Sequence, residues 1–446
     1  MALGTRIVVI GGGAGGIGAA GAARATDRDA VVRVFTEFED VGYSPCGIPY
    51  VHGREIDSFE RLFLADKQTY EDAGIDVRYE TRVDGIDLDR RTIAVAGSGP
   101  EPFDRLIIAT GFEYEPPDVP GSDLDGLYYV KNIRQAMEWD RVLDQARSAV
   151  VVEATPLGLE MLTALAHRGI DVHLVDPRPW LLADVADPDI MAPVEESLAE
   201  LGVTFHFRTE VERFVGDGKV RSVRTSAEDI PADVVVICTH KRPNNRLAAD
   251  AGIKIGSTGG MIVNERMETS ADGVYGAGDC VELPHEVTQV PIVALTGSHA
   301  YAQGKVAGSN AGGGNRRYQP VYVPWGMVAG TKMIGGASLG ETLATALGMP
   351  YVMGVAEGIS RARYYPDVQK LRVKLLFDPS NRRLVGAQMV GGEGIKERAD
   401  FLGMAIKKHA TVDDLAWMEN VYSPPIGALN EPIALAAQDC LARLGG

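Results

Sequence analysis

The chain has 446 residues, of which 45% are hydrophobic and 24% charged, a balance typical of a folded protein with a sizeable core. Acidic residues outnumber basic ones, 61 to 44, and the net charge of −17 makes nucleic-acid or membrane-surface binding a poor expectation. Glycine is in excess, with 52 residues. These glycines form no collagen-like period and no low-complexity tract, so they indicate tight turns and close backbone approaches.

The first elements in chain order are a strand, a glycine turn, a helix and a second strand. Residues 6–10 form a short apolar run of buried-strand type, and residues 11–16 read Gly-Gly-Gly-Ala-Gly-Gly. A small-residue helix is expected over residues 17–24 and a strand over 31–35. This order is typical of a mononucleotide-binding βαβ unit.

The same order returns about 140 residues later. An apolar run at 149–152 leads through a turn into a helical segment at 159–168 and a strand at 172–175. After residue 320, strand-like runs precede a helical segment at 395–409, and no glycine loop opens there. The sequence therefore predicts an α/β protein with two Rossmann-like domains and a C-terminal α+β domain that serves dimerisation. We expect the first domain to hold residues 1–115 and 249–325, interrupted by a second at 116–248, with the third at 326–446.

The first glycine loop fits the pattern G-x-G-x-x-G at Gly11, Gly13 and Gly16. These glycines permit a tight turn, close approach of a pyrophosphate, and packing of the helix on the sheet. An acidic residue is expected at the end of the second strand to bind a ribose. Here Thr36 holds that position and the carboxylate is Glu37, so the ribose contact is shifted by one residue.

Cysteine usage indicates a reducing compartment, so we expect a cytoplasmic protein. The four cysteines are scattered and form no C-x-x-C pair, which argues against a disulfide scaffold or a zinc site. No apolar run is long enough to span a bilayer, and the apolar N-terminal stretch lacks the basic leader of a signal peptide. We expect no metal site.

Three segments resemble the FAD-dependent pyridine nucleotide-disulfide oxidoreductases. They are the strand and turn at 106–111, the segment at 269–279 that ends in Asp279, and Gly42-Tyr-Ser-Pro-Cys-Gly-Ile-Pro-Tyr50. The last is similar to the single-cysteine branch, which holds coenzyme A-disulfide reductases, NADH oxidases and peroxidases, and persulfide reductases. The resemblance covers nearly the whole chain and implies FAD at the first site. The residues that it assigns to the FAD are Gly11, Gly13, Ala14, Gly15, Gly16, Glu37, Ser44, Cys46, Val83, Ala109, Thr110, Gly111 and Asp279.

Cys46 is the candidate redox residue. A lone cysteine is more often a buried small hydrophobe, but the resemblance implies that this sulfur lies against the flavin. No partner cysteine lies four or five residues away, so an internal disulfide is not expected. The expected redox forms are a thiolate with a mixed disulfide, or a thiolate with a sulfenic acid.

The resemblance also implies residues that assist Cys46. Tyr422, in Asn-Val-Tyr-Ser-Pro-Pro, is similar to a family tyrosine that reaches the partner subunit's active site and protonates the leaving thiolate or orients the substrate. Tyr364 and Tyr365 resemble a second tyrosine site, of which Tyr365 is taken as the catalytic candidate. Arg24 is expected to contact a substrate phosphate. For Tyr422 a packing role, and for Arg24 a solvated helix end, are the alternatives.

The second nucleotide site departs from the family pattern. In place of G-x-G-x-x-G the chain has Glu153, Ala154, Thr155, Pro156, Leu157 and Gly158, so only the last glycine remains. A β-branched Thr155 obstructs a pyrophosphate, and the Glu153 carboxylate repels it. His240 stands where relatives carry glycine, whereas Asp176 still closes the second strand as a ribose-binding acid would. NAD(P)H binding is therefore expected to be weak, altered or absent.

These features favour an FAD enzyme that reduces a coenzyme A-type disulfide or persulfide through Cys46 and acts as a homodimer. An oxidase or peroxidase with a cysteine sulfenic acid is a first alternative, which the absence of a histidine near residue 10 mildly disfavours. A second alternative is a flavoprotein that no longer uses NAD(P)H and takes electrons from a protein donor, acts on another substrate, or senses redox state. Glu153 and His240 would then form an acid/base pair, or simply fill the groove. The chain ends at Gly446, so we expect no C-terminal rhodanese domain.

Overall fold

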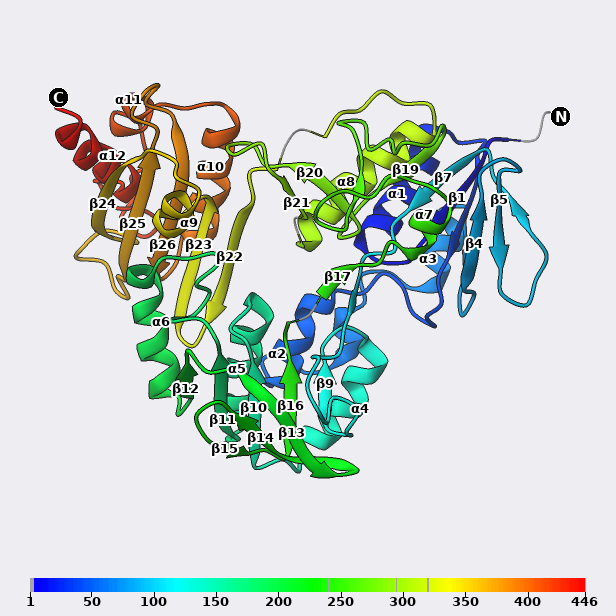
Figure 1. Ribbon diagram of the computed structural model, residues 1–446. Helices are drawn as coiled ribbons and strands as arrows, with labels where there is room; N and C mark the ends of the chain where they lie inside the picture. Colours follow the sequence, from blue (N-terminus) through cyan, green and yellow to red (C-terminus); the bar gives the residue numbers. More distant parts are fainter. Residues whose placement is uncertain (1–3, 240, 294, 319–320, 446) are drawn as a thin grey trace. The chain divides into compact units, whose positions relative to one another are not determined.

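The computed structural model describes residues 4–239, 241–293, 295–318 and 321–445 (Figure 1). The chain divides into two compact units, and both are discontinuous in sequence. The first unit holds residues 1–45, 58–115 and 240–321, and the second holds residues 46–57, 116–239 and 322–446. The division into three domains stays a prediction.

A five-stranded parallel sheet forms the core of the first unit. In spatial order its strands are β19 (Val274–Gly276), β7 (Arg105–Ile108), β1 (Arg6–Ile10), β2 (Val31–Phe35) and β3 (Ile75–Arg78). Ile7 and Val9 in β1 are fully buried, as expected for a parallel strand with both faces covered. Because β1 has β2 on one side and β7 on the other, its carboxyl end lies at the switch point where such sheets bind ligands.

Two glycine-rich helices pack closely in this unit, α1 (Ala14–Thr26) and α8 (Gly297–Ala311). A methyl group at Gly304 would lie 2.1 Å from the Gly15 carbonyl oxygen, and one at Gly308 would lie 2.0 Å from the Ala19 carbonyl oxygen. Real Cβ atoms do not approach backbone oxygens so closely. Part of the glycine excess therefore allows these helices to touch backbone to backbone.

The second unit repeats the parallel arrangement of the first. Its strands, in spatial order, are β12 (Thr204–Phe207), β11 (Asp171–Asp176), β10 (Ser148–Val152), β16 (Val234–Ile237) and β9 (Leu127–Tyr129). β10 takes the central place that β1 has in the first sheet, and α5 (Pro156–His167) follows it. The predicted pair of Rossmann-like folds is confirmed.

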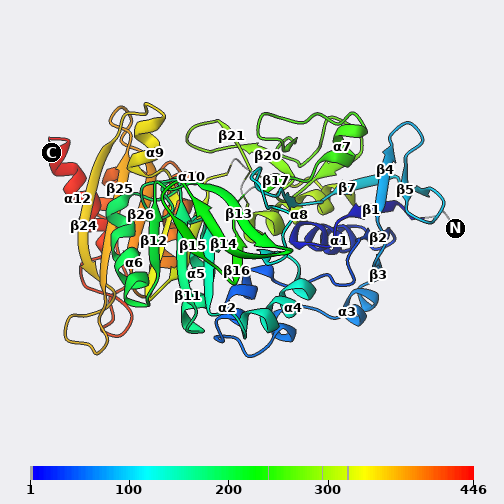
Figure 2. The same ribbon diagram turned by 60° about the horizontal axis from the view of Figure 1, so that its bottom comes forward.

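A five-stranded antiparallel sheet in the second unit holds the C-terminal part of the chain. Its strands, in spatial order, are β22 (Pro324–Ala329), β23 (Lys332–Ser338), β26 (Leu384–Gly391), β25 (Lys370–Phe377) and β24 (Val352–Ile359). Helix α10 (Ile395–Lys407) packs on β23 and β26, and α12 (Pro432–Arg443) packs on β24 (Figure 2). This confirms the expected C-terminal α+β fold.

The remaining elements complete the two units. In the first unit they are α3 (Lys67–Asp72), β4 (Val83–Asp87), β5 (Thr92–Val95), β6 (Glu101–Pro102), β8 (Phe112–Tyr114), β17 (Lys241–Pro243), α7 (Arg246–Asp250), β18 (Met261–Ile262), β20 (Val281–Pro284) and β21 (Pro291–Ile292). In the second unit they are α2 (Ile48–His52), α4 (Ile133–Leu143), α6 (Pro188–Glu200), β13 (Val211–Asp217), β14 (Lys219–Thr225), β15 (Asp229–Pro231), α9 (Glu341–Ala346) and α11 (Val412–Ala416). Among the helices of the described residues, none has the length and apolar character needed to cross a membrane.

Two of the differences from the sequence expectation concern α1 and the second unit. Helix α1 begins at Ala14, directly after the extended Gly13, rather than at residue 17, because Gly15 and Gly16 continue the helix. The strands β13 to β15, which come between β12 and β16 in the sequence, form a separate antiparallel sheet that the sequence pattern did not predict. Phe214, Val223 and Ile230 bury its apolar face against β10 and β16, so long-range packing makes these polar segments strands.

Candidate functional site

The first glycine loop lies between β1 and α1 and has the geometry of a phosphate-binding turn. Gly11 has a φ of +109°, and a methyl group there would lie 2.2 Å from the Ala109 carbonyl oxygen. A methyl group at Gly16 would lie 1.9 Å from the Gly11 carbonyl oxygen. At Gly13, in contrast, an added methyl group meets no protein atom within 4 Å. Gly11 and Gly16 are therefore required by the fold, whereas Gly13 faces open space.

The N-terminus of α1 is available to an anion. The helix starts after Gly13, and among the described residues no side chain caps its first turn. The first N–H groups of a helix have no partner within the helix and carry a partial positive charge. The open space at Gly13 and the uncapped helix start together fit a dinucleotide diphosphate such as that of FAD.

Three chain segments reach this same edge of the sheet. The turn Ala109–Gly111 follows β7, and Gly111 has a φ of +69°. Asp279 follows β19 in the turn after Gly278, which has a φ of +87°. The Thr110 hydroxyl donates to the Asn244 carbonyl oxygen at 2.6 Å and holds its turn in place. The predicted residues of the glycine loop, of the turn at 109–111 and of the Asp279 turn thus follow the carboxyl ends of β1, β7 and β19.

The other residues of the first unit that are assigned to the FAD follow β2 or lie later in the chain. Thr36, directly after β2, is buried, whereas Glu37 is exposed and its carboxylate faces solvent. This fits a ribose contact shifted by one residue. Ser44 donates its backbone N–H to the Leu62 carbonyl oxygen at 2.9 Å, and Val83 is the first residue of β4.

Cys46 differs in exposure from the other cysteines. Its side chain is exposed, whereas Cys238, Cys280 and Cys440 are buried. It lies in a 3-10 turn, Pro45–Gly47, immediately before α2. Burial raises the pKa of the Cys440 thiol to about 11, which keeps that thiol protonated and unreactive. Exposure argues against the reading of Cys46 as a buried small hydrophobe.

In the second loop, between β10 and α5, side chains of the loop itself take up the space and an N–H group that a phosphate would need. Glu153 has a φ of +69°, the left-handed conformation that a glycine would adopt at this position without strain. The Thr155 hydroxyl accepts the Gly158 N–H at 3.2 Å and so caps α5. It also donates to the Cys238 carbonyl oxygen at 3.1 Å. The helix start that would face a diphosphate is closed by Thr155.

Arg178 lies across this loop and pairs with the acidic residues around it. It donates to Glu153 Oε2 at 2.6 Å, to Asp176 Oδ1 at 2.9 Å, and also to Asp184. Asp176 is fully buried, and its Oδ2 accepts the Ala154 N–H at 2.6 Å. Burial works to lower the pKa of Arg178, but its hydrogen bonds to Asp176 and Asp184 raise it above the ordinary value. His240, the other predicted member of this site, lies outside the described residues.

The tyrosines of the C-terminal region are placed in a way that distinguishes Tyr364 from Tyr365. The hydroxyls of Tyr364 and Tyr422 lie 2.8 Å apart on an exposed surface, and their hydrogen bond raises the pKa of Tyr364. The Tyr365 ring lies against the Arg361 guanidinium, 5.9 Å from ring centre to Cζ. The structure therefore brings Tyr364 rather than Tyr365 to Tyr422.

Tyr50 and Glu160 form a pair that the sequence pattern did not single out. The Tyr50 hydroxyl donates to Glu160 Oε1 at 3.3 Å, from α2 to α5. Burial and then the charge of Glu160 raise the pKa of Tyr50 above its ordinary value. Tyr50 lies in α2, which begins directly after the 3-10 turn that holds Cys46. It closes the segment Gly42–Tyr50 that carries the family resemblance, and membership of that segment is the sequence signal that could have found it.

A groove of about 630 Å³ runs along the outer faces of α1 and α8 in the first unit. Small residues of α1 line it together with the basic residues Lys305, Arg316 and Arg317, of which Arg317 pairs with Glu265. Arg24, at the end of α1, is not among the residues that line it and donates instead to the Arg28 carbonyl oxygen.

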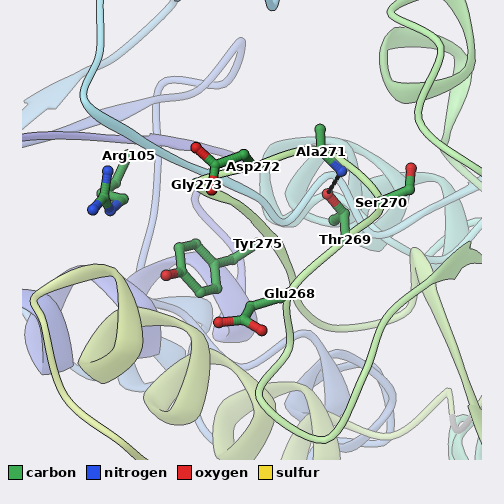
Figure 3. Close-up of a pocket in the computed structure, with 8 residues that line it drawn as sticks. All are labelled: Arg105, Glu268, Thr269, Ser270, Ala271, Asp272, Gly273 and Tyr275. Carbon is green, nitrogen blue, oxygen red and sulfur yellow. Dashed lines mark hydrogen bonds between the residues drawn. The ribbon is translucent and has the colours of Figure 1, made fainter.

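A second hollow, of about 510 Å³, lies at the opposite edge of the sheet (Figure 3). Figure 3 shows Tyr275 between Glu268 and the Asp272–Gly273 turn, with Arg105 nearby. Arg105 is the first residue of β7, so this hollow lies at the amino ends of the parallel strands. Such sheets bind their ligands at the carboxyl ends, so we do not assign it to a nucleotide. Within the described residues, no group of three or more His, Cys, Asp or Glu side chains is arranged to hold a metal ion.

Comparison with known proteins gives matches along most of the chain. Residues 5–304 match the family model described as pyridine nucleotide-disulphide oxidoreductase, and residues 331–432 match the dimerisation domain of the same family. A protein of Methanocaldococcus jannaschii named NADH oxidase is 35% identical, and the alignment covers 98% of this chain and 99% of that protein.

Two further relatives carry names that mention sulfur chemistry. A protein of Pyrococcus abyssi named NAD(P)H sulfur oxidoreductase (CoA-dependent) is 30% identical over 97% of each chain. The solved structure of an NAD-dependent persulfide reductase from A. fulgidus superposes with a TM-score of 0.95 at 32% identity, over 99% of this chain and 84% of that one.

Proposed function

Because this chain belongs to the pyridine nucleotide-disulphide oxidoreductase family, we propose that it reduces a coenzyme A-type disulfide or persulfide through Cys46, with weak or altered use of NAD(P)H. Family and relatives make it an FAD-dependent oxidoreductase with a dimerisation domain. The observation that carries the thiol assignment is exposure, because Cys46 is accessible while the other three cysteines are buried.

The first site supplies what FAD requires. The N–H groups at the start of α1 and the open face of Gly13 would hold the diphosphate. Glu37 would bind the adenosine ribose, and Asp279, after β19, the chain between the diphosphate and the flavin ring. When bound, FAD supplies two-electron transfer to sulfur.

The proposed reaction at Cys46 is thiol–disulfide exchange. The Cys46 thiolate attacks one sulfur of the substrate disulfide, the substrate S–S bond breaks, and a mixed disulfide forms between Cys46 and one half of the substrate. The other half leaves as a thiolate and takes a proton from the Tyr422 hydroxyl. Two electrons, which bound FAD would supply after its own reduction by NAD(P)H or a protein donor, then cleave the mixed disulfide. This restores the Cys46 thiolate and releases the second thiol after protonation.

The exposed surface around Tyr422 supports a homodimer that shares its active sites. Trp417, Val421, Ile426 and Leu429 surround Tyr422 in sequence and are 72%, 76%, 69% and 68% exposed. A cluster of exposed apolar side chains of this kind marks a protein–protein interface. The hydrogen bond between Tyr364 and Tyr422 holds the Tyr422 hydroxyl in place, so we assign the assisting pair to Tyr364 and Tyr422 of the partner copy.

The groove along α1 and α8 supports a substrate that carries phosphates. Lys305 and Arg316 line it, in a chain whose net charge is −17, and small side chains on α1 leave room for an extended ligand. Coenzyme A has an extended arm that ends in a phosphorylated nucleotide, and the Pyrococcus abyssi relative is named as CoA-dependent. A protein electron donor remains part of the proposal, because the second nucleotide site is closed by its own side chains.

The alternative function is oxygen or peroxide reduction through a sulfenic acid at Cys46. The name of the 35% identical relative, NADH oxidase, favours it. Because the sulfenic acid also needs an accessible thiolate, the exposure of Cys46 fits both functions. The two functions differ in their electron acceptor, which is a disulfide or persulfide in one and oxygen or peroxide in the other. Turnover assays with each acceptor therefore separate them.

Substitution of the redox cysteine tests the proposal. In Cys46→Ser we expect reduction of coenzyme A disulfide to fall by roughly a thousandfold or more, because the nucleophile is lost, while the visible flavin spectrum persists. Cys440→Ala, which removes a buried thiol, serves as the matched control and should retain turnover. Full disulfide turnover in Cys46→Ser would remove the thiol mechanism. Wild-type protein that turns over oxygen or peroxide but no disulfide would favour the oxidase alternative.

Use of the pyridine nucleotide is tested separately by anaerobic mixing of the wild-type holoenzyme with NADH or NADPH. The closed second site predicts slow bleaching of the flavin absorbance by either nucleotide. Rapid bleaching by either one would remove weak NAD(P)H use from the proposal and leave the role of Cys46 standing.

A further inference from the structure

The second Rossmann-like fold is intact, although its glycine loop is not. β10 pairs in parallel with β11 and β16, as β1 pairs with β2 and β7. Gly158 also keeps its packing role, since a methyl group there would lie 2.3 Å from the Glu153 carbonyl oxygen. The obstacle to a dinucleotide is therefore local and lies in the side chains above the sheet edge.

We propose that Arg178 is an internal occupant of the second nucleotide site and that Glu153 locks it there. This inference deepens the weak nucleotide use of the proposed function and rests on it. The Arg178 guanidinium donates to Glu153 on one side and to Asp176 on the other, at 2.6 and 2.9 Å. It thus spans from the loop after β10 to the end of β11, where a dinucleotide would place its diphosphate and adenosine ribose.

Asp176, the acid that would bind the ribose, already accepts hydrogen bonds on both of its carboxylate oxygen atoms. Asp176 Oδ2 accepts the Ala154 N–H at 2.6 Å, and Oδ1 accepts the Arg178 backbone N–H at 2.7 Å and its Nε at 2.9 Å. The Asp176 side chain is completely buried. A ribose of NADH would have to displace these bonds, and leaving a buried carboxylate with fewer partners is costly.

The lock is held under backbone strain. Glu153 adopts a φ of +69°, a left-handed conformation that is unfavourable for a residue with a side chain. Its hydrogen bond to Arg178 offsets that cost, since charge-assisted pairs of half-buried groups are among the stronger side-chain contacts. Replacing Glu153 by glycine removes the strain, the negative charge and the lock in one step.

The freed cation selects the ligand. An arginine beside the acid at the end of the second strand is the group that recognises the 2′-phosphate of a phosphorylated dinucleotide. With Glu153 gone, Arg178 keeps its pairs with Asp176 and with Asp184, but its Nη2 loses the 2.6 Å bond to Glu153 and can turn toward an anion. The site opened in this way should therefore prefer NADP⁺ over NAD⁺.

Equilibrium binding of the oxidised nucleotides tests this without turnover. We expect Glu153→Gly to bind NADP⁺ about tenfold or more tightly than the wild type, with a smaller gain for NAD⁺. Glu153→Gln, which removes the charge but keeps the strain, should gain less. Glu80→Gly is the matched control, because Glu80 is an exposed glutamate with a φ of +50° in the first unit and should leave binding unchanged.

The outcomes separate the two proposals. If the wild type binds weakly and both Glu153 variants bind no better, the lock is disproved and the weak nucleotide use stands. If Glu153→Gly gains equally for NAD⁺ and NADP⁺, or keeps its preference when Arg178→Ala is added, Arg178 is not the selecting group. Tight binding of either nucleotide by the wild type would contradict the proposed weak use of NAD(P)H. Circular dichroism checks that each variant is folded. If Glu153→Gly does not fold, nucleotide binding by Glu153→Gln tests the proposal instead.

Discussion

At the residue scale, two glycines three positions apart in the first loop have different duties. Gly16 has no room for a side chain because the Gly11 carbonyl oxygen lies 1.9 Å from an ideal Cβ. Gly13 has free space around it and an ordinary φ of −77°. Gly13→Ala should therefore leave the fold intact and fill the space of the FAD diphosphate. We expect its affinity for FAD to fall about tenfold or more.

Titration of apoprotein with FAD, followed by flavin fluorescence, measures this effect. Gly21→Ala is the matched control, since Gly21 lies on the same helix and a methyl group there also meets no atom within 4 Å. It should leave the FAD affinity unchanged and stabilise α1 by roughly 0.5–1 kcal/mol. Unchanged FAD binding in Gly13→Ala would mean that the diphosphate does not lie at this loop.

Single residues could be predicted where their chemistry is local. The loop Gly11–Gly16 follows from a pattern within six positions, and the loss of glycines at Glu153 and Thr155 can be read the same way. The occupation of that loop by Arg178 could not, because it depends on a side-chain direction 25 residues further along. Likewise only the folded surface shows that Tyr364, rather than its neighbour, meets Tyr422.

At the element scale, a buried lysine joins a helix of the second Rossmann-like fold to the C-terminal sheet. Lys374 of β25 lies 3.0 Å from Asp187 and 2.8 Å from both Asp189 and Glu341, and it is 2% exposed. Asp187 precedes α6 and also accepts the backbone N–H groups at the start of α9. These bonds fix α6, α9 and β25 to one another.

Removing this cation should destabilise the protein strongly. Lys374→Met leaves Asp187 buried without its counter-ion, and breaking a buried pair in this way costs about 3–5 kcal/mol. Lys396→Met is the control, because Lys396 is 76% exposed and pairs with Asp400 on the surface of α10. That change should cost less than about 0.5 kcal/mol. Urea unfolding of both variants measures the difference, and equal losses would contradict the structural role of Lys374.

Element type was predictable where periodicity is strong, as in β1, β10, β25 and α10. The short antiparallel sheet β13 to β15 was missed, because its strands are polar on one face and gain their stability from packing against β10 and β16. The cap that Asp187 supplies to α9 spans more than 150 positions and leaves no local signal. Long-range contacts of this kind are what the sequence pattern does not contain.

At the scale of the whole molecule, the two parallel sheets have similar strand topology but carry different loops after their central strands, β1 and β10. The helix after β1 starts uncapped beside an open Gly13, whereas the helix after β10 starts capped by Thr155, and Arg178 is bonded to Glu153 just before it. The first Rossmann-like fold thus has space for a dinucleotide. In the second, as proposed above, the Arg178 side chain takes the place of one. Part of the glycine excess of the chain serves the first loop and the contact of α1 with α8. The loss of glycine at Glu153 marks the change at the second loop.

Acid should destabilise the whole protein through its buried histidines. Burial lowers the pKa of His285 to about 4 and also lowers the pKa of His52, which lies between Asp140 and Tyr128. Because the unfolded chain takes up these protons first, near pH 6.5, stability is complete above that pH and is lost as the pH falls toward 4. For His285 the loss approaches roughly 3 kcal/mol.

Thermal unfolding between pH 7.5 and 4.5 checks this sign and size. The unfolding midpoint of the wild type should stay level from pH 7.5 to about 6.5 and fall as the medium is acidified below that pH. His285→Gln removes the group that takes up the proton, so its midpoint should depend less steeply on pH than that of the wild type, whatever its midpoint at neutral pH. Identical slopes for the two proteins would show that the buried His285 does not couple folding to pH.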